Sequence, residues 1–294
     1  KDEEKIGEIE TKTVDDVRKE PLPLLKGFEW STLDMKDPAQ ADELYCLLRD
    51  NYVEDDDNMF RFEYSKPFLQ WCVVSTVEFY LHDILTLLPY RALTPPDYYP
   101  EWHVAVRKEG GGKLLAFIAG IPVRELVLAA MIPFNLFFLQ EHKIKGIRAM
   151  EQKDVPRVTE MMQEYLKRCL IGWYRGLCFI HFTPSLQQNG EITDFFSYYH
   201  LPSSILNHPE YKTLRAVYSF YNIPQKHTLK ELLQESLIQA NKDGADVMNA
   251  LELMDNGEVF KDLKFGPGDG HLQYYLYNWA CPPMDSKDLG VVLL

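Results

Sequence analysis

Cysteine is scarce in this sequence, and its five residues show no spacing typical of a disulfide framework or a zinc site. The number is odd and no two of them form a Cys-x-x-Cys pair, so we expect reduced thiols and no bound metal. Basic residues are also few: 31 Lys and Arg against 44 Asp and Glu give a net charge of −13. Because general nucleic-acid binding depends on neutralising phosphates with Lys and Arg, this balance argues against a nucleic-acid partner and favours basic ones.

Long uncharged apolar runs are lacking as well. The most apolar stretches, 72–90 and 121–139, carry charged residues, and neither offers the ~18 uncharged apolar residues that a membrane span requires. The first residues, KDEEKIGEIE, lack the apolar run of a secretory signal. We therefore predict a cytoplasmic chain without a membrane span.

Charge and apolar periodicity suggest an arm followed by ordered structure. Residues 1–20 are charge-dense without a helical stripe, which predicts a disordered arm. Asp37 before Pro38 is typical of a helix start, because the side chain can cap and the proline needs no N–H there. Alternation around a glycine-rich turn predicts a strand pair over 102–107 and 113–123.

The second half alternates strands and helices more clearly. Asp154 followed by Pro156 predicts the start of an amphipathic helix. Thr228 and Glu231 form a capping box for another helix, which Gly244 ends. Strands are expected over 192–199, 214–221, 246–251 and 272–279. This alternation predicts an α+β fold in which mixed sheets are packed by helices.

A run of four carboxylates is the most distinctive feature, within NYVEDDDNMFRF at 51–62. Such a run is usually a solvated loop. The alternative is a pocket for a basic peptide with Phe60 and Phe62 as its apolar floor. An opposite charge ~4 Å away contributes roughly 1 kcal/mol in water and about 4 kcal/mol at a semi-buried site. A calcium loop would need glycine where Phe60 stands. The residues alone leave the solvated loop and the pocket open.

Two segments near the end of the chain are also unusual. The sequence FGPGDG at 265–270 lacks the Gly-Lys-Ser/Thr ending of a phosphate loop, so a tight turn is the simpler interpretation. The tail GVVLL at 290–294 is apolar, whereas chain ends are normally polar. It either packs simply in the core or carries its α-carboxylate inside, where that group needs a partner or works as a base.

Several of these segments resemble the N-myristoyltransferases, or glycylpeptide N-tetradecanoyltransferases. The resemblance rests on LYCLLRDNYVEDDDNMFRFEYS at 44–65, PPDYYPEWHVAVR at 95–107, GIRAMEQKDVPRV at 146–158, GEITDFFSYYHLPSSILNHP at 190–209, and FGPGDGHLQYYLYNW at 265–279 with the terminal GVVLL.

The resemblance implies tandem acetyltransferase-like halves: a partial acyl-CoA-binding half over 21–145 and a peptide-binding half over 146–294. It implies a monomeric acyltransferase that moves myristoyl from myristoyl-CoA, a co-substrate and not a permanently bound cofactor, to the amino-terminal glycine of proteins with basic residues nearby. The α-carboxylate of Leu294 is then the general base. By the same resemblance the peptide groove is lined by Tyr52, Val53, Asp55, Asp56, Asp57, Phe60, Phe62, Tyr64, Ser203, Tyr218, Asp269 and Leu272.

The first half is shorter than the family pattern. Between Arg124 and Gly146 the segments that would form the oxyanion hole and hold the CoA pyrophosphate are missing. Residues 72–91 are an unmatched insertion and, like 126–139, they resemble translated non-coding sequence. Two alternatives to an active enzyme follow, namely a catalytically inactive glycyl-peptide-binding remnant and an incomplete gene model.

Overall fold

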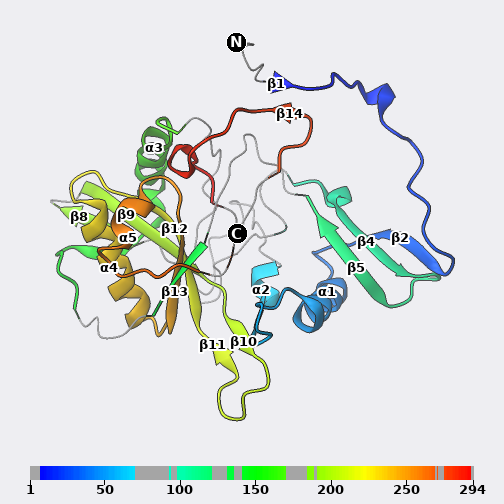
Figure 1. The fold of residues 1–294 in the computed structure, drawn as a ribbon, viewed down its shortest axis with the longest axis horizontal. Helices are drawn as coiled ribbons and strands as arrows, with labels where there is room; N and C mark the ends of the chain where they lie inside the picture. Colours follow the sequence, from blue (N-terminus) through cyan, green and yellow to red (C-terminus); the bar gives the residue numbers. More distant parts are fainter. Residues whose placement is uncertain are drawn as a thin grey trace.

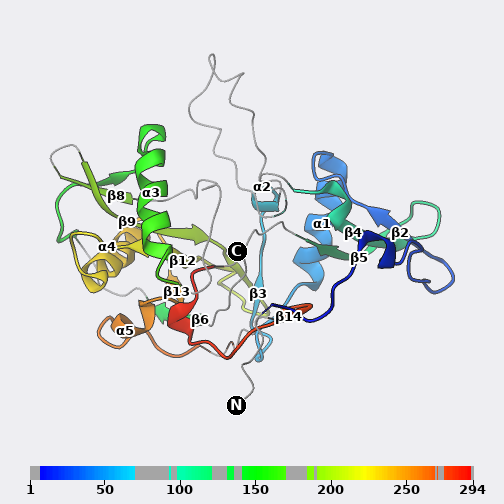
Figure 2. The same cartoon turned by 90° about the horizontal axis from the view of Figure 1, so that it is seen from above.

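The computed structural model describes residues 7–69, 93, 98–120, 131–135, 141–169, 184–188, 191–268, 270 and 275–292. Their elements form two groups that lie side by side, with a small sheet between them (Figures 1 and 2). One group comes from the first half of the chain and the other mainly from the second. This arrangement agrees with the expected mixed sheets packed by helices.

The first group is a three-stranded antiparallel sheet with one helix on it. The order is β2 (Phe28–Thr32), β4 (His103–Lys108) and β5 (Leu114–Ala119), and α1 (Pro38–Asn51) packs against β5. The predicted helix start is confirmed, since the Asp37 carboxylate accepts a hydrogen bond of 2.9 Å from the backbone N–H of Ala39. The predicted strand pair is confirmed: β4 lies one residue later than predicted, and β5 ends at Ala119, with residues 121–123 of the prediction outside the described part of the chain. Two short elements contact this group, α2 (Lys66–Leu69) at α1 and η2 (Pro100–Trp102) at β2, and η1 (Val14–Asp16) precedes it in the chain.

The second group is a mixed six-stranded sheet. Its order is β6 (Met131–Asn135), β13 (Val247–Leu251), β12 (Ala216–Ile223), β9 (Glu191–His200), β8 (Pro184–Gln188) and β7 (Ile147–Ala149). Only β12 and β13 run parallel among these neighbours. The edge strand β6 comes from the stretch 126–139, which has no clean strand pattern. Its Pro133 has no N–H to donate, which an edge strand tolerates.

Helices cover both faces of this sheet. Because alternate residues of β9 point to opposite faces, Phe195 and Tyr199 share a core with α3 (Val155–Leu166), whereas Phe196 and Tyr198 share one with α4 (Leu229–Lys242). The capping box of Thr228 and Glu231 is present as predicted. Two short elements follow the sheet in the chain: α5 (Asn256–Phe260) and η4 (Ser286–Asp288), with η3 (Gln152–Asp154) preceding α3.

Two pairings join segments far apart in the sequence. β3 (Phe60–Phe62) pairs with β10 (Ser203–Ile205), which also pairs with β11 (Thr213–Leu214). β1 (Gly7–Glu8) pairs with β14 (Trp279–Ala280), so part of the arm predicted as disordered contacts the end of the chain. The domain boundaries predicted at residues 20 and 145 stay predictions.

The predicted strand over 272–279 is wrong where the structure describes it, because only Trp279 of residues 275–279 belongs to a strand. Asn278 has a φ of 56°, in the left-handed region that interrupts an extended run. Its carboxamide binds the backbone of Glu10, accepting from the N–H at 2.8 Å and donating to the carbonyl at 2.6 Å. Residues 272–274 lie outside the described part of the chain.

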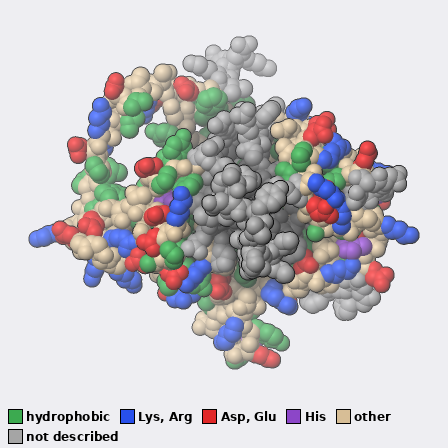
Figure 3. Space-filling model, turned by 180° about the vertical axis from the view of Figure 1, so that it is seen from behind, with side chains coloured by type: hydrophobic (Ala, Val, Ile, Leu, Met, Phe, Trp, Pro, Cys, Tyr) green, Lys and Arg blue, Asp and Glu red, His purple; other side chains and the backbone are tan. Residues whose placement is uncertain are grey.

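Charges of both signs are mixed on the face of the molecule opposite to that of Figure 1. On the face shown in Figure 3, acidic and basic side chains are interspersed among the described residues. Within the described ranges, every helix is too short or too polar to cross a bilayer.

Candidate active site

The acidic run forms a loop, and Asp55, its first aspartate, stabilises that loop through hydrogen bonds to the backbone. The Oδ1 atom of Asp55 accepts hydrogen bonds of 2.7 Å from the backbone N–H groups of both Met59 and Phe60. Asn58, with a φ of 52°, supplies the left-handed position that the turn requires. The Asp55 carboxylate therefore keeps its charge, but its Oδ1 atom is engaged by the loop backbone.

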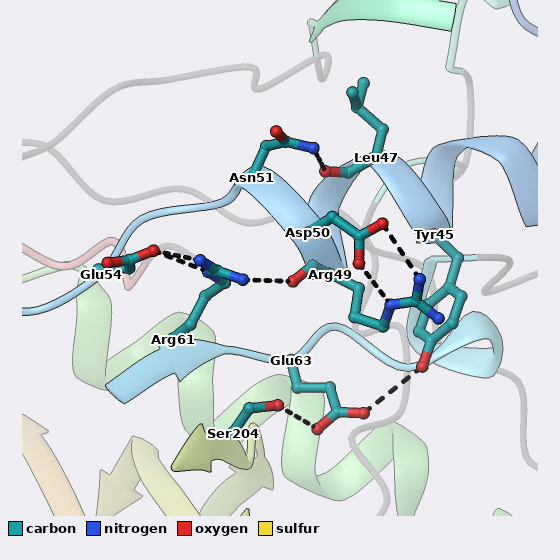
Figure 4. Close-up of polar contacts among 9 residues, drawn as sticks. All are labelled: Tyr45, Leu47, Arg49, Asp50, Asn51, Glu54, Arg61, Glu63 and Ser204. Atoms are coloured by element: carbon teal, nitrogen blue, oxygen red, sulfur yellow. Dashed lines mark hydrogen bonds and ion pairs between the residues drawn. The ribbon is translucent and has the colours of Figure 1, made fainter. Parts of the chain in front are cut away.

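The glutamate before it is paired. Arg61 donates hydrogen bonds to the carboxylate of Glu54 and, at 3.1 Å, to the carbonyl of Arg49 at the end of α1 (Figure 4). Glu54 and Arg61 also form an isolated β-bridge. The pair cancels one charge of the run and ties the loop to α1.

Two aspartates of the run keep their charges on the surface. Asp56 and Asp57 are exposed and have no hydrogen bond or ion pair with any residue that the structure describes. Val53 beside them is 60% exposed. The acidic run thus offers two solvated carboxylates and an apolar side chain instead of four equivalent charges.

Glu63 links the loop to the second half of the chain. Its carboxylate accepts hydrogen bonds from Ser204 Oγ at 2.8 Å and from Tyr45 Oη at 3.4 Å (Figure 4). Its backbone N–H donates to the carbonyl of Pro202 at 3.0 Å, beside the β3–β10 pairing. This pairing places Phe62 directly opposite the buried Ser203.

Aromatic rings continue from β3 into the second half. Tyr52 lies edge-on to Tyr64 with ring centroids 5.1 Å apart, and Phe62 is 6.2 Å from Tyr218. Tyr218 in turn stacks on Tyr199 at 5.4 Å. Burial, followed by the proximity of Tyr52, raises the pKa of the Tyr64 hydroxyl above its usual value. We call these five residues the aromatic cluster.

The end of the chain enters the same core. Leu289, Val291 and Val292 are buried together with Tyr199 and Tyr218 of the aromatic cluster. Phe62 and Tyr64 pack against that core from the first half. The structure therefore brings the tail, the loop after α1 and strand β12 to one place.

The comparisons with known proteins agree with this arrangement. The model of the myristoyl-CoA:protein N-myristoyltransferase C-terminal domain matches residues 181–292, and that of the N-terminal domain matches 8–84 and 79–144. The chain belongs to the N-myristoyltransferase family. The members of this family are acyltransferases.

Named relatives cover nearly the whole chain. A glycylpeptide N-tetradecanoyltransferase 2 of Danio rerio is 33% identical over 95% of this chain and 72% of its own length. A glycylpeptide N-tetradecanoyltransferase of Drosophila melanogaster is 32% identical over 96% and 76%. The alignment with the Danio rerio protein runs over 375 residues, more than the 294 of this chain, so that relative carries residues without a counterpart here.

A solved structure confirms the fold. Saccharomyces cerevisiae N-myristoyltransferase with bound myristoyl-CoA superimposes with a TM-score of 0.80 at 26% identity, covering 99% of this chain and 90% of that one. The expectation of an α+β fold of the N-myristoyltransferase type is therefore correct.

The predicted groove residues fall into three sets. Tyr52, Phe62, Tyr64 and Tyr218 belong to the aromatic cluster, and Ser203 lies opposite Phe62. Val53, Asp56 and Asp57 are exposed beside it, whereas Asp55 and Phe60 are tied into the loop through the backbone of Phe60. Two further groove residues, Asp269 and Leu272, and the predicted general base Leu294 lie outside the described residues. The assignments of all these residues to catalysis or peptide binding stay predictions.

The structure adds residues that sequence reasoning missed. Glu63 bonds to Tyr45 and Ser204, and Tyr221 bonds to the tail, yet no pattern in the sequence marks either residue. Tyr221 lies within an aromatic-rich strand, where a core role is the natural interpretation. Among the described residues, no group of His, Cys, Asp and Glu is arranged to hold a metal ion.

Proposed function

We propose that this chain transfers a myristoyl group from myristoyl-CoA to the amino-terminal glycine of peptides and proteins. Its family membership and the names of its relatives support this function. The observation that carries the proposal is that the tail is buried as far as Val292, in the same core as Tyr218. A tail that merely frayed in solvent could not take part in chemistry at that place.

The proposed general base is the α-carboxylate of Leu294. An α-amino group has a pKa of ~8, so at neutral pH most glycine amines are protonated and cannot attack. The burial of Val292 supports this role, because two further residues span at most about 7 Å and a carboxylate at that distance would be within reach of the core. The carboxylate takes one proton from the ammonium, and the amine then attacks the thioester carbonyl. The new C–N bond forms as the C–S bond breaks; a second proton of the amine leaves with CoA as its thiol, and the third stays on the amide nitrogen.

The proposed peptide preference follows from the two solvated carboxylates. Asp56 and Asp57 would favour peptides with a lysine downstream of the glycine. Because both are exposed, each contact contributes about 0.2–1 kcal/mol and weakens with salt. We also propose that the protein is a monomer acting in the cytoplasm, which size-exclusion chromatography and imaging of the tagged protein would check.

The direct test is incubation of the purified chain with myristoyl-CoA and a glycine-first peptide, followed by mass spectrometry. We expect an N-myristoylated product, and no product from an otherwise identical alanine-first peptide. Adding one glycine after Leu294 moves the carboxylate, so we expect kcat to fall by about 10²–10⁴, the usual contribution of a general base. Lys287→Ala, an exposed change close by, is the matched control and should leave kcat unchanged.

A second candidate is a glycyl-peptide-binding protein without catalysis. The observation that favours it is the longer alignment with the Danio rerio relative, which carries residues that this chain lacks. The candidate predicts saturable binding of the glycine-first peptide by isothermal titration calorimetry, with no acylated product. Product formation at an ordinary enzymatic rate contradicts it.

A further inference from the structure

Strand β12 contains an irregularity directly before the residue that contacts the tail. Ser219 pairs with Tyr198 and Asn222 pairs with Phe196, so Phe220 and Tyr221 both stand opposite the single residue between them on β9. This is a β-bulge, and one extra residue reverses the face to which every later side chain points. Tyr221 therefore lies in the same core as Tyr218 and Phe220 instead of facing α4.

Ser197, the residue opposite the bulge, satisfies its buried backbone. The Ser197 hydroxyl donates to the carbonyl of Tyr221 at 2.9 Å and accepts from the N–H of Tyr221 at 3.0 Å. A bulge leaves backbone groups without ladder partners, and burying them unpaired is costly. The serine thus holds the backbone of Tyr221 in the position that the bulge creates.

The hydroxyl of Tyr221 holds the tail at two points. It donates to the carbonyl of Gly290 at 3.0 Å and accepts from the N–H of Val292 at 3.2 Å. Tyr221 is 2% exposed, so water does not compete easily for either bond. Both contacts are to backbone, which fixes the path of the tail whatever its side chains.

The tail is also confined on its other side. A Cβ atom built on Gly290 would lie 2.9 Å from Leu166 Cδ2 and 3.1 Å from Cys169 Sγ, near the end of α3. The backbone of the tail therefore runs between α3 and the Tyr221 hydroxyl with no room for a side chain at Gly290. A shift of the tail toward α3 would break its hydrogen bonds with Tyr221, and a shift away from α3 would break its packing against Leu166.

We propose that Tyr221 is a positioning residue for catalysis, which fixes the tail so that the carboxylate two residues beyond Val292 is held in reach of the substrate amine. The inference rests on the proposed function. Tyr221 acts through the tail, without touching the reacting atoms. A general base must lie within hydrogen-bond distance of its proton, and loss of such placement lowers the rate without weakening substrate binding.

The test is Tyr221→Phe in the full chain, which removes the hydroxyl and keeps the ring. We expect kcat to fall about 10-fold or more, with KM for myristoyl-CoA and for the glycine-first peptide unchanged, since an imprecisely placed base slows the proton transfer. Hydrogen exchange of the Val292 amide, followed by mass spectrometry of the C-terminal peptide, should become faster because this amide loses its acceptor.

The matched control is Tyr198→Phe. Its hydroxyl donates to Asp243 at 2.6 Å on the opposite face of the same strand pair, so this variant also loses a buried tyrosine hydrogen bond. We expect Tyr198→Phe to lower Tm about as much as Tyr221→Phe does. Its kcat and the hydrogen exchange of its Val292 amide should equal those of the wild type.

The possible outcomes separate this inference from the proposed function. Unchanged exchange at Val292 in Tyr221→Phe overturns the contact itself. Faster exchange with unchanged kcat overturns the positioning role, as does an equal fall of kcat in Tyr198→Phe. A wild-type chain that is inactive while its Val292 amide is protected overturns the proposed function, and the positioning role with it, although the contact stands.

Discussion

Gly290 occupies a position where even one added carbon is expected to matter. In Gly290→Ala the new methyl group would overlap Leu166 and crowd Cys169, both buried, so the tail or α3 must shift. We expect a loss of about 1–3 kcal/mol in the free energy of unfolding, as for other overpacked cores, together with a lower kcat. Urea denaturation and steady-state kinetics measure the two effects.

The control for that change is Gly257→Ala. There the atoms nearest to the added Cβ belong to the side chain of Glu252, with Oε1 at 2.9 Å and Cγ at 3.1 Å, and this side chain is exposed and can move aside. We expect little change in stability or kcat. Equal losses in both variants would show that the tail is not tightly packed.

The solvated aspartates give a second prediction at the scale of single residues. In the double variant Asp56→Asn with Asp57→Asn we expect KM for a lysine-bearing peptide to rise several-fold at low salt, since each exposed pair contributes about 0.2–1 kcal/mol. KM for a peptide without lysine should not change. Asp15→Asn, an equally exposed change in the arm, is the control. An equal rise for both peptides would contradict a charge-based preference.

For single residues, the sequence indicates which segments are unusual better than it indicates the contact that each side chain makes. It indicates that the acidic run is either solvated or a pocket, and the structure divides the run: Asp55 folds the loop, Glu54 pairs with Arg61, and the remaining two aspartates are solvated. Which carboxylate finds which partner depends on the loop backbone, which no periodicity encodes. Tyr221 was missed because strict alternation along a strand fails at a bulge.

Among the elements, α3 begins where the sequence predicts, but the carboxylate of Asp154 has a role that the sequence does not indicate. Asp154 stands at the N-cap position, but its side chain makes no capping bond. Its carboxylate instead accepts from Arg148 of β7, at 2.6 and 2.9 Å, and from the backbone N–H of Glu151 at 2.7 Å. Two hydrogen bonds from a charged guanidinium are stronger than one capping bond from a neutral backbone N–H. The carboxylate of Asp154 therefore joins β7 to α3.

This contact predicts a pH dependence of stability. The hydrogen bond from Arg148 is the main cause that lowers the pKa of Asp154, and burial only partly offsets it. A lowered folded-state pKa stabilises the fold above the unfolded value of ~3.9, and this contribution is lost as pH falls through the folded value. We expect Asp154→Asn to cost about 2 kcal/mol at pH 7, and the difference from wild type to shrink below pH 4.

Urea titrations at several pH values measure this difference. Glu160→Gln, which breaks an exposed pair with Arg157, is the control and should change stability little at any pH. A difference between Asp154→Asn and wild type that stays constant from pH 7 to pH 3 would contradict the ionic role of Asp154.

Elements whose signals are local were predictable. The capping box at Thr228, the cap at Asp37 and the aromatic strands β9 and β12 all depend on residues a few positions apart, and the structure has them. β14 and β6 depend on distant partners instead. The carboxamide of Asn278 is hydrogen-bonded to the backbone of Glu10, and β6 forms by pairing with β13. No window of neighbouring residues contains either partner.

For the molecule as a whole, the contacts that assemble the site join segments far apart in the sequence. β3 pairs with β10 and β1 with β14, which link the first part of the chain to the second, and within the second half the tail contacts Tyr221. These contacts span much of the chain, so composition and periodicity could not predict them, whereas the resemblance to the N-myristoyltransferases did imply that the acidic loop and the tail share one site. The identity of the missing segments also came from the resemblance alone.

The same long-range pairing yields a prediction about where the chain can be divided. The sheet of the second half includes β6, so a fragment over 146–294 leaves β13 as an unpaired edge with the apolar sequence VMNAL. Exposed apolar edges associate with other chains. We expect this fragment to aggregate, and a fragment over 131–294, which keeps β6, to contain less aggregate and melt at a higher temperature. Both fragments lack β3 equally, so size-exclusion chromatography and thermal melts of the two report on β6. Indistinguishable behaviour would show that β6 adds nothing to the sheet and would favour a boundary at 145.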